Sequence, residues 1–293
     1  TGVNDDPITA NGSISLDEDS SAGGTFSALD QDSDDDISSL SYEITSAPSL
    51  GSASLVNGGP DFEFVATGAF DDIPVGQDDE VSFSWKATDS HGAESESSIT
   101  VEVIGVNDSP TSQGGASSTD EDSAVSGSLV GTDIDLFETD SLLYAITSST
   151  TGGAASTDAA GNFSFDPLDD FQGLAVGESA TDSFFFNVTD VNSAVSNESE
   201  VVLTINGVND APTSSGSAAS TDEDSVLAGP LLADDVDSNE ATSLSYVITV
   251  GTNGGVATTD GAGGFSYETE SVDDRWSAGF EEMPADIRSC WVP

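Results

Sequence analysis

Residues 105–110 read Gly-Val-Asn-Asp-Ser-Pro, and the same string with one variable position occurs at residues 2–7 and 207–212. Two other landmarks recur with nearly the same step along the chain. Asp-Glu-Asp-Ser begins at Asp17, Asp120 and Asp222, and a pair of aspartates in the pattern Asp-x-Asp begins 13 residues later in every copy. A register shared by three motifs predicts homologous domains in tandem, over residues 1–104, 105–206 and 207–293.

Apolar residues alternate with polar ones inside each copy, as in Val81-Ser-Phe83-Ser-Trp85. This period of two is typical of strands with one buried face, and no segment has a convincing stripe with the 3.6-residue period of a helix. Some seven short strands in about 100 residues is the pattern of an immunoglobulin-like sandwich. The sequence therefore predicts an all-β chain of tandem immunoglobulin-like β-sandwich domains, and its short linkers predict an extended rod.

Residues 275–293 depart from the repeat. They contain both Arg residues of the chain, its only Met, its only Cys (Cys290) and two of its three Trp residues. The repeat register matches them to residues 173–191, which they do not resemble, so we expect the third copy to be incomplete. Two interpretations stay open: an altered or truncated end of a longer array, and a terminal cap or assembly segment anchored by Trp276, Phe280 and Trp291.

The chain is very acidic, with 55 Asp and Glu residues against 3 Lys and Arg residues and a net charge of -52. This charge excludes nucleic acid as a direct partner, and it must be neutralised for compact folding. Asp outnumbers Glu by 37 to 18, and Asp is typical of turns and of hard-cation sites. The composition predicts a divalent metal as counter-charge, and calcium best fits an oxygen-only ligand set.

The composition does not decide the cellular compartment of the protein. One cysteine cannot form an internal disulfide, which is compatible with the cytosol or with a bacterial cell surface. No apolar run approaches the roughly 18 residues of a membrane span, and no basic segment followed by an apolar one opens the chain. We expect a soluble mature protein or a fragment of a longer one, with no membrane span.

The repeated strings resemble the bacterial VCBS and cadherin-like tandem repeats of large secreted adhesins of the RTX type. The resemblance rests on Gly-Val-Asn-Asp-x-Pro, Glu-Asp-Ser, Asp-x-Asp, Leu-x-Tyr-x-Ile-Thr and a late Thr-Asp, and it extends to about residue 274. It implies a calcium-dependent extracellular rod, secreted or on the cell surface, that serves adhesion or holds a binding tip away from the cell. Its partner would be a cell-surface glycan or protein.

The order of strands in a sandwich predicts where the acidic motifs lie. If the first strand runs from top to bottom, Asp-Glu-Asp-Ser lies at the bottom, whereas Asp-x-Asp and the late Thr-Asp lie at the top. Linkers join the bottom of one domain to the top of the next, so three segments should supply oxygen ligands at each junction. Calcium takes six to eight such ligands, and the arrangement resembles the interdomain sites of cadherins.

The predicted ligands fall into three sets. The first junction has Glu18, Asp71, Asp72, Asn107, Asp108, Asp133, Asp135 and Asp190. The second junction has Glu121, Asp169, Asp170, Asn209, Asp210, Asp235 and Asp237, and we expect it to be weaker because the tail replaces the partner of Asp190. The corresponding residues of the first copy are Asp5, Asp30, Asp32 and Asp89.

Other classes of function are less well supported. The only histidine, His91, lies in a Ser-His-Gly turn that has no histidine in the second copy, so the sequence does not predict an enzyme. The many acids would also supply the paired carboxylates of a glycosidase, but a catalytic pair is a single site, whereas these acids recur once per domain. A carbohydrate-binding module is an alternative, although Phe83, Trp85 and Phe186 fall at alternating positions that favour a core role.

A filament assembled by strand exchange is another alternative. A third domain without its last strands would expose an apolar face with Leu244, Tyr246, Ile248 and Phe265. The segment from Ile8 to Ile14 of a second molecule is the predicted donor strand. Such head-to-tail contacts do not close, so they would build a filament. The partner of the protein would then be a second copy of itself.

Overall fold

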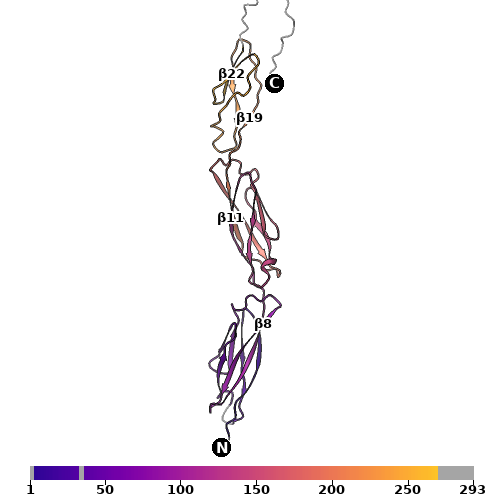
Figure 1. The fold of residues 1–293 in the computed structure, drawn as a ribbon, viewed down its shortest axis with the longest axis vertical. Helices are drawn as coiled ribbons and strands as arrows, with labels where there is room; N and C mark the ends of the chain where they lie inside the picture. Colours follow the sequence, from indigo (N-terminus) through magenta and orange to yellow (C-terminus); the bar gives the residue numbers. More distant parts are fainter. Residues whose placement is uncertain (1–2, 33–35, 270–293) are drawn as a thin grey trace, which may run out of the picture. The chain divides into compact units, whose positions relative to one another are not determined.

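A computed structural model describes residues 3–32 and 36–269, and Figure 1 shows its strands. The described chain falls into two compact units. The first comprises the residues up to Asp170 together with Ala180–Ile205, and the second comprises Phe171–Ser179 together with the residues from Asn206 onward. Regular structure in the described residues is β, apart from the short 3-10 helix η1 (Thr139–Ser141). The predicted all-β class is confirmed.

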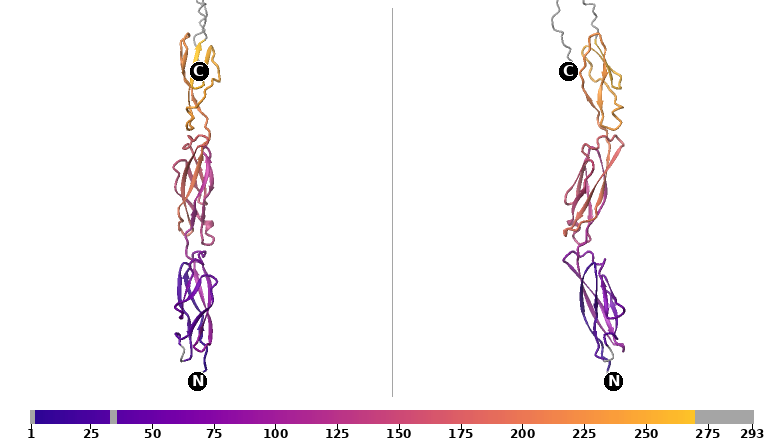
Figure 2. Two further views of the ribbon diagram at one scale, coloured as in Figure 1. Left: turned by 90° about the vertical axis from the view of Figure 1, so that its left-hand side faces the viewer. Right: turned by 180° about the vertical axis from the view of Figure 1, so that it is seen from behind.

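The first repeat, residues 1–104, is a sandwich of two sheets. One sheet has the order β2-β9-β8-β5 and the other has the order β3-β7-β6, while β1 pairs with β4. The strands of the larger sheet are β2 (Gly12–Asp17), β9 (Glu94–Ile104), β8 (Asp78–Thr88) and β5 (Ser41–Ser46). The remaining strands are β3 (Ser21–Thr25), β7 (Asp61–Val65), β6 (Ser52–Leu55), β1 (Ile8–Ala10) and β4 (Ser27–Leu29). Strand β2 runs parallel to β9, and β8 runs antiparallel to β9. Figure 2 shows this sandwich from two further sides, in indigo to purple.

The second repeat, residues 105–206, has the same topology. Its sheets have the orders β11-β18-β17-β14 and β12-β16-β15, and β10 pairs with β13. The strands of the larger sheet are β11 (Gly115–Asp120), β18 (Ser199–Asn206), β17 (Ser179–Thr189) and β14 (Leu143–Ser148). The others are β12 (Val125–Ser128), β16 (Asn162–Asp166), β15 (Ala154–Thr157), β10 (Thr111–Gln113) and β13 (Val130–Thr132).

Alternating aromatic residues build the core between the sheets. Trp85, Phe83 and Phe26 are fully buried or nearly so in the first repeat. The rings of Phe26 and Trp85 stack with their centroids 4.2 Å apart. Phe184 and Phe186 are buried at the corresponding positions of β17. The expected core role of these aromatic residues is confirmed, and none of them forms an exposed platform.

The third repeat is described as far as Thr269. It contains β19 (Thr213–Ser215) paired with β21 (Leu232–Asp234), and a sheet of β20 (Leu227–Pro230), β23 (Gly264–Thr269) and β22 (Gly255–Thr259). Leu244, Tyr246, Ile248 and Phe265 are only partly buried there, whereas Leu40, Tyr42 and Phe62 of the first repeat are buried. The divergent segment 275–293, with Trp276, Phe280, Cys290 and Trp291, lies outside the described residues.

The predicted donor strand is engaged in its own repeat. Ile8–Ala10 pairs with β4, and Gly12–Asp17 pairs with β9 over six residues. Donation of this segment to another molecule would break both pairings, so the expectation of a free first strand is wrong.

Candidate metal centre

Glu18 occupies the turn that follows β2, at the end of the first repeat that is joined to the linker. Its backbone N–H donates to the carbonyl of Ile104 at 3.0 Å, which ties the turn to the end of β9. Its side chain is completely buried, and its Oε1 accepts a hydrogen bond from the N–H of Val106 at 2.8 Å. Its Oε2 is buried and accepts no hydrogen bond from the described residues.

Asp133 and Asp135 lie in the loop that follows β13, at the facing end of the second repeat. The N–H of Asp135 donates to Asp133 Oδ1 at 3.0 Å, which is the local turn that Asp favours. The N–H of the linker residue Asp108 donates to Asp135 Oδ2 at 3.0 Å. Asp135 is only 2% exposed, so the linker and the loop enclose its carboxylate.

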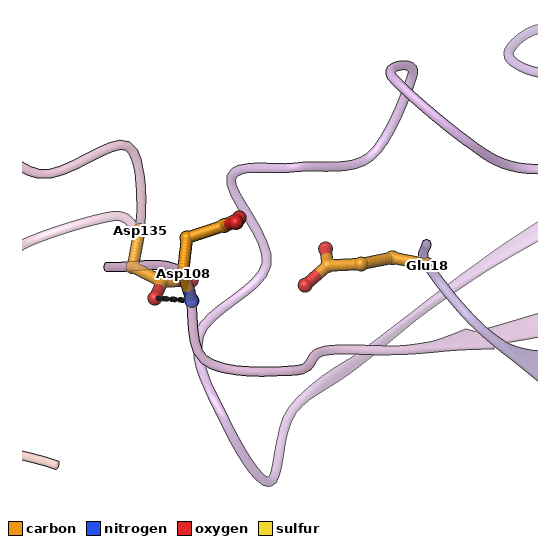
Figure 3. A group of neighbouring side chains, drawn as sticks. All are labelled: Glu18, Asp108 and Asp135. Atoms are coloured by element: carbon orange, nitrogen blue, oxygen red, sulfur yellow. Dashed lines mark hydrogen bonds between the residues drawn. The ribbon is translucent and has the colours of Figure 1, made fainter. Parts of the chain in front are cut away.

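Glu18, Asp108 and Asp135 form the first acidic group, in which one carboxylate oxygen from each residue lies within 4.8 Å of the others. Figure 3 shows the Glu18 carboxylate directed toward Asp108, which is hydrogen-bonded to Asp135. Each residue has one buried oxygen that no hydrogen-bond donor of the described chain reaches: Glu18 Oε2, Asp108 Oδ2 and Asp135 Oδ1. Buried polar atoms without partners are costly, and these three, from one repeat, the linker and the next repeat, fit a hard cation.

Asp133, Glu138 and Asp190 form the second acidic group, again with ligand atoms within 4.8 Å of one another. All three belong to the second repeat. Asp190 follows β17, where its Oδ2 accepts from Asn107 Nδ2 at 2.9 Å. Glu138 is 7% exposed, and its Oε1 accepts from Asn192 Nδ2 at 3.0 Å. The buried Oδ2 of Asp133 and Oδ1 of Asn107 accept no hydrogen bond from the described residues.

Glu138 was not among the predicted ligands, although the sequence contains a signal for it. The pattern Asp-x-Asp extends to Asp-x-Asp-x-x-Glu in two copies, ending at Glu138 and Glu240. In the third repeat Asp235, Asp237 and Glu240 likewise have ligand atoms within 4.8 Å of one another. Because the glutamate side chain is longer, it reaches back to the aspartates from three residues away.

Burial and like charge raise the pKa of four carboxyl groups: Glu18, Asp108 and Asp135 of the first acidic group, and Glu138 of the second. For Glu18, burial raises the pKa, and the Val106 N–H opposes this effect. For Asp108 and Asp135, burial is the largest cause and neighbouring carboxylates add to it. Burial, and then the charges of Asp135, Asp133 and Asp190, raise the pKa of Glu138. A bound cation favours the ionised forms, so protons and cations would compete here.

Asp71 and Asp72 were predicted to supply carboxylate ligands at the first junction, but neither belongs to the first acidic group. The carbonyl of Asp72, not its carboxylate, accepts from the N–H of Leu136 at 3.1 Å. The Asp71 carboxylate accepts from the N–H of Gly68 at 3.1 Å within its own turn. Its charge still contributes to the raised pKa of Asp108.

Asp169 and Asp170 are not the structural equivalents of Asp71 and Asp72 in the second repeat, and their role as ligands stays a prediction. The carbonyl of Gly173 accepts from the N–H of Ser238, as that of Asp72 accepts from Leu136. Asp170 Oδ2 instead accepts from the N–H of Gly153 at 2.7 Å. The two aspartate pairs lie on opposite sides of a shared aromatic turn, at Phe70 and Phe171, so matching by residue type shifted the register.

The ligands predicted for the other positions recur in the same local geometry. Glu121 follows β11 as Glu18 follows β2. In the third repeat, the N–H of Asp210 donates to Asp237 Oδ2 at 2.9 Å, and the N–H of Asp237 donates to Asp235 Oδ1 at 3.1 Å. Asn209 Nδ2 donates to the carbonyl of Asp210 at 2.6 Å.

The first repeat has the same arrangement at its N-terminal end. The N–H of Asp5 donates to Asp32 Oδ2, and the N–H of Asp32 donates to Asp30 Oδ1, both at 2.8 Å. Asn4 Nδ2 donates to Asp89 Oδ2 at 2.8 Å, as Asn107 does to Asp190. Asn4 was not predicted, although it occupies the same motif position as Asn107.

These features define a class of protein: tandem immunoglobulin-like sandwiches with acidic ends. The profile of the bacterial Ig domain family matches residues 4–102 and 107–205, so the chain belongs to that family. No curated protein sequence matches it. No described helix has the length and apolar character needed to cross a membrane.

Solved cadherin structures are similar in fold. Human CDH23 EC21-23 matches with a TM-score of 0.56 and 14% identity, over 92% of this chain and 91% of that one. Mouse cadherin-23 EC22-24 matches with a TM-score of 0.52 and 17% identity, over 91% and 89%. The protocadherin gammaB7 EC3-6 cis-dimer structure matches with a TM-score of 0.54 and 16% identity, and the chain spans 66% of its length. These likenesses show a cadherin-like fold.

Proposed function

We propose that the chain is a calcium-stabilised structural or adhesive repeat segment of a bacterial surface or secreted protein, of the VCBS or RTX adhesin type. One observation carries the proposal: Glu18, Asp108 and Asp135, from the first repeat, the linker and the second repeat, have carboxylate oxygens within 4.8 Å of one another, and each has a buried oxygen that accepts no hydrogen bond from the described residues. Glu18, Asp108 and Asp135 would hold a cation between the repeats. Asp133, Glu138 and Asp190, with the amide oxygen of Asn107, would hold a second cation in the top loops of the second repeat.

The ligand chemistry supports calcium over other metals. Every candidate ligand atom is an oxygen, and neither group contains histidine or cysteine, so zinc and copper are poorly matched. Magnesium requires near-ideal octahedral geometry and keeps several waters, whereas calcium accepts irregular cages of six to eight oxygens. Asp71 is near enough to influence Asp108, and its carboxylate could join the cage after a side-chain rotation.

Calcium would act on the junction between the first and second repeats. Without a cation, the acidic groups repel one another and loosen the linker. With a cation, the linker and both repeats share ligands, which stiffens the connection into a rod-like spacer. Extracellular modules bind calcium at roughly 10⁻⁴–10⁻³ M, which is consistent with an extracellular or cell-surface location. The second junction, with Glu121, Asn209, Asp210, Asp235 and Asp237, remains a prediction based on the repeat.

The other classes gain no support from the site. The aromatic residues that a carbohydrate-binding module would present are buried. Strand exchange through Ile8–Ile14 would have to break two existing pairings. Immunoglobulin-like and cadherin-like domains are typically structural modules, and we propose no catalytic role.

Thermal melts in excess calcium, in excess magnesium and in chelator test the proposal. Calcium should raise the melting midpoint by many degrees, because the cation binds the folded state and relieves the repulsion between carboxylates. Magnesium should raise it much less. Equal midpoints in calcium and chelator would contradict the proposed function.

A further inference from the structure

Gly105, the first residue of the linker, lies in a space that has no room for a side chain. A β-carbon built on Gly105 would lie 2.4 Å from the carbonyl oxygen of Ile73 and 2.5 Å from that of Pro74. Both distances are shorter than any ordinary carbon–oxygen contact, and both neighbours are backbone atoms that no rotamer change can move. The backbone of Gly105 does not have a positive φ, so the requirement for glycine here is one of space.

Gly105 is also tied on both sides to the turn that carries Glu18. The preceding residue, Ile104, accepts from the N–H of Glu18 at 3.0 Å. The following residue, Val106, donates its N–H to Glu18 Oε1 at 2.8 Å. The N–H of Gly105 itself donates to the carbonyl of Gln77 at 3.0 Å. The linker is therefore closely packed against residues 71–77, contrary to the idea of a flexible glycine hinge.

The facing loop, residues 71–77, has a backbone fixed by its own hydrogen bonds. The Ile73 N–H donates to the carbonyl of Phe70 at 3.1 Å, and the Gln77 N–H donates to that of Pro74 at 3.0 Å. The same loop contacts the second repeat through the carbonyl of Asp72, which accepts from the N–H of Leu136. Close contact at Gly105 thus holds the linker, and with it the Val106 N–H donor to Glu18, against this loop.

We infer that Gly105 is a positioning residue for the cation site between the first two repeats. The inference rests on the proposed function, because it assigns Gly105 its role through the ligand Glu18. A methyl group at residue 105 must push the linker and the loop apart. If the linker moves, the Val106 donor to Glu18 is displaced; if the loop moves, the contact of the Asp72 carbonyl with Leu136 of the second repeat is displaced. Either movement disturbs the placement of Glu18 beside Asp108 and Asp135.

The third repeat supplies an independent example. A β-carbon on Gly207 would lie 2.1 Å from the carbonyl oxygen of Leu174 and 2.4 Å from that of Ala175. The N–H of Gly207 donates to the carbonyl of Glu178 at 3.0 Å, as that of Gly105 does to Gln77. The same contact therefore occurs at both linkers, which argues against an accident of one loop.

The test compares Gly105→Ala with Gly115→Ala in the full chain. Gly115 begins β11, and a β-carbon built there meets no atom within 4 Å, so it is the matched control. Calcium is titrated calorimetrically, and the binding component that Glu18→Gln weakens identifies the junction site. Gly105→Ala should weaken that component by at least about tenfold, as loss of an outer positioning contact does in metal sites. Gly115→Ala should not change it.

The double variant Glu18→Gln with Gly105→Ala shows whether Gly105 acts by positioning Glu18 or has a general effect on calcium binding. If Gly105 acts through Glu18, the double variant should bind calcium as Glu18→Gln alone does. Additive losses would overturn the inference, and so would a Gly105→Ala variant that binds calcium like the parent chain.

Amide exchange measured in chelator tests the contact without any metal. The Val106 amide should exchange at least about tenfold faster in Gly105→Ala, because its acceptor on Glu18 is displaced. Unchanged Val106 protection would overturn the inference. Loss of protection at Val101 and Val103 in β9 would also overturn it, because Gly105 would then serve the fold of the whole repeat. Absence of calcium binding in the parent chain would sink the proposed function but would leave the Val106 result to be judged separately.

Discussion

Phe137 is a single residue whose conformation conflicts with its type. It has a φ of 69° and is 86% exposed, between the acidic residues Asp135 and Glu138. A left-handed conformation costs a residue with a β-carbon roughly 1–2 kcal/mol, and asparagine tolerates it better than most. The third repeat has Asn239 at the same position, with a φ of 64°. The loop therefore requires this backbone conformation whatever the residue.

Phe137→Asn should raise the free energy of unfolding by about 0.5–1 kcal/mol, because it relieves the strain and removes an exposed ring. Denaturant melts in chelator measure the change. Phe137→Leu is the control, since leucine lacks the short polar side chain by which asparagine tolerates the left-handed region. A destabilised Phe137→Asn variant would mean that the ring makes contacts that its exposure hides.

Glu18 has opposite effects on stability with and without calcium. In chelator at pH 7, Glu18→Gln should raise the free energy of unfolding by about 1–3 kcal/mol, because it removes a buried charge with an unpaired oxygen. In excess calcium it should lower stability, because a ligand is lost. Melts of both proteins in both conditions test this; a variant that is less stable in chelator as well would contradict it.

The pH dependence of that difference follows from the raised pKa of Glu18. The folded state holds the proton to higher pH than the unfolded state, so the penalty of Glu18 is absent below the unfolded pKa and develops as pH rises through the folded pKa. The advantage of Glu18→Gln in chelator should therefore shrink as pH falls from 7 toward the ordinary glutamate range. A difference that stays constant over that range would show that ionisation of Glu18 is not its cause.

At the scale of elements, strand β8 combines a core face with an outer face. Val81, Phe83 and Trp85 point into the sandwich, and Ser82 is exposed between them. The ring of Trp85 stacks on Phe26, which directly follows β3 of the opposite sheet. The stability of the first repeat therefore depends on this contact between sheets.

Trp85→Ala should lower the free energy of unfolding of the first repeat by about 3–5 kcal/mol, because it leaves a large cavity between the sheets. Urea unfolding of the full chain measures the loss, and Ser82→Ala on the exposed face of β8 is the control. A loss of less than about 1 kcal/mol would mean that the two sheets close over the space.

At the scale of the whole molecule, the net charge of -52 opposes compact association of the repeats. The first junction brings acidic residues of two repeats together, so its order should depend on counter-ions more than either sandwich does. The cores of the sandwiches do not need counter-ions, because they are built from buried apolar side chains.

Asp133→Ala combined with Asp135→Ala should loosen the first junction and leave each sandwich folded, because both residues lie in a loop outside the strands. Small-angle scattering in calcium should show greater flexibility than in the parent chain. Asp140→Ala, at an exposed acidic position of η1, is the control. If the double variant unfolds the second repeat and does not change the scattering of the junction, its proposed role between repeats is wrong.

The β class, the core residues of β8 and β17 and most residues of the acidic groups could be predicted from the sequence. Alternation with period two reports which side chains of a strand are buried, and recurrence at a constant step distinguishes the acidic motifs from isolated solvated turns. Asp-x-Asp could be found in this way because a hydrogen bond within its own loop sets its geometry.

Only the tertiary structure decided the rest, because it depends on contacts between segments distant in sequence. Glu138 joins Asp133 and Asp190 through loop packing, and Asp72 contributes a carbonyl where a carboxylate was expected. The mistaken match of Asp170 to Asp72 has the same origin, since residue type does not report the position of a turn. The requirement for glycine at residue 105 arises from two carbonyl groups about thirty residues earlier in the chain, which no local pattern can reveal.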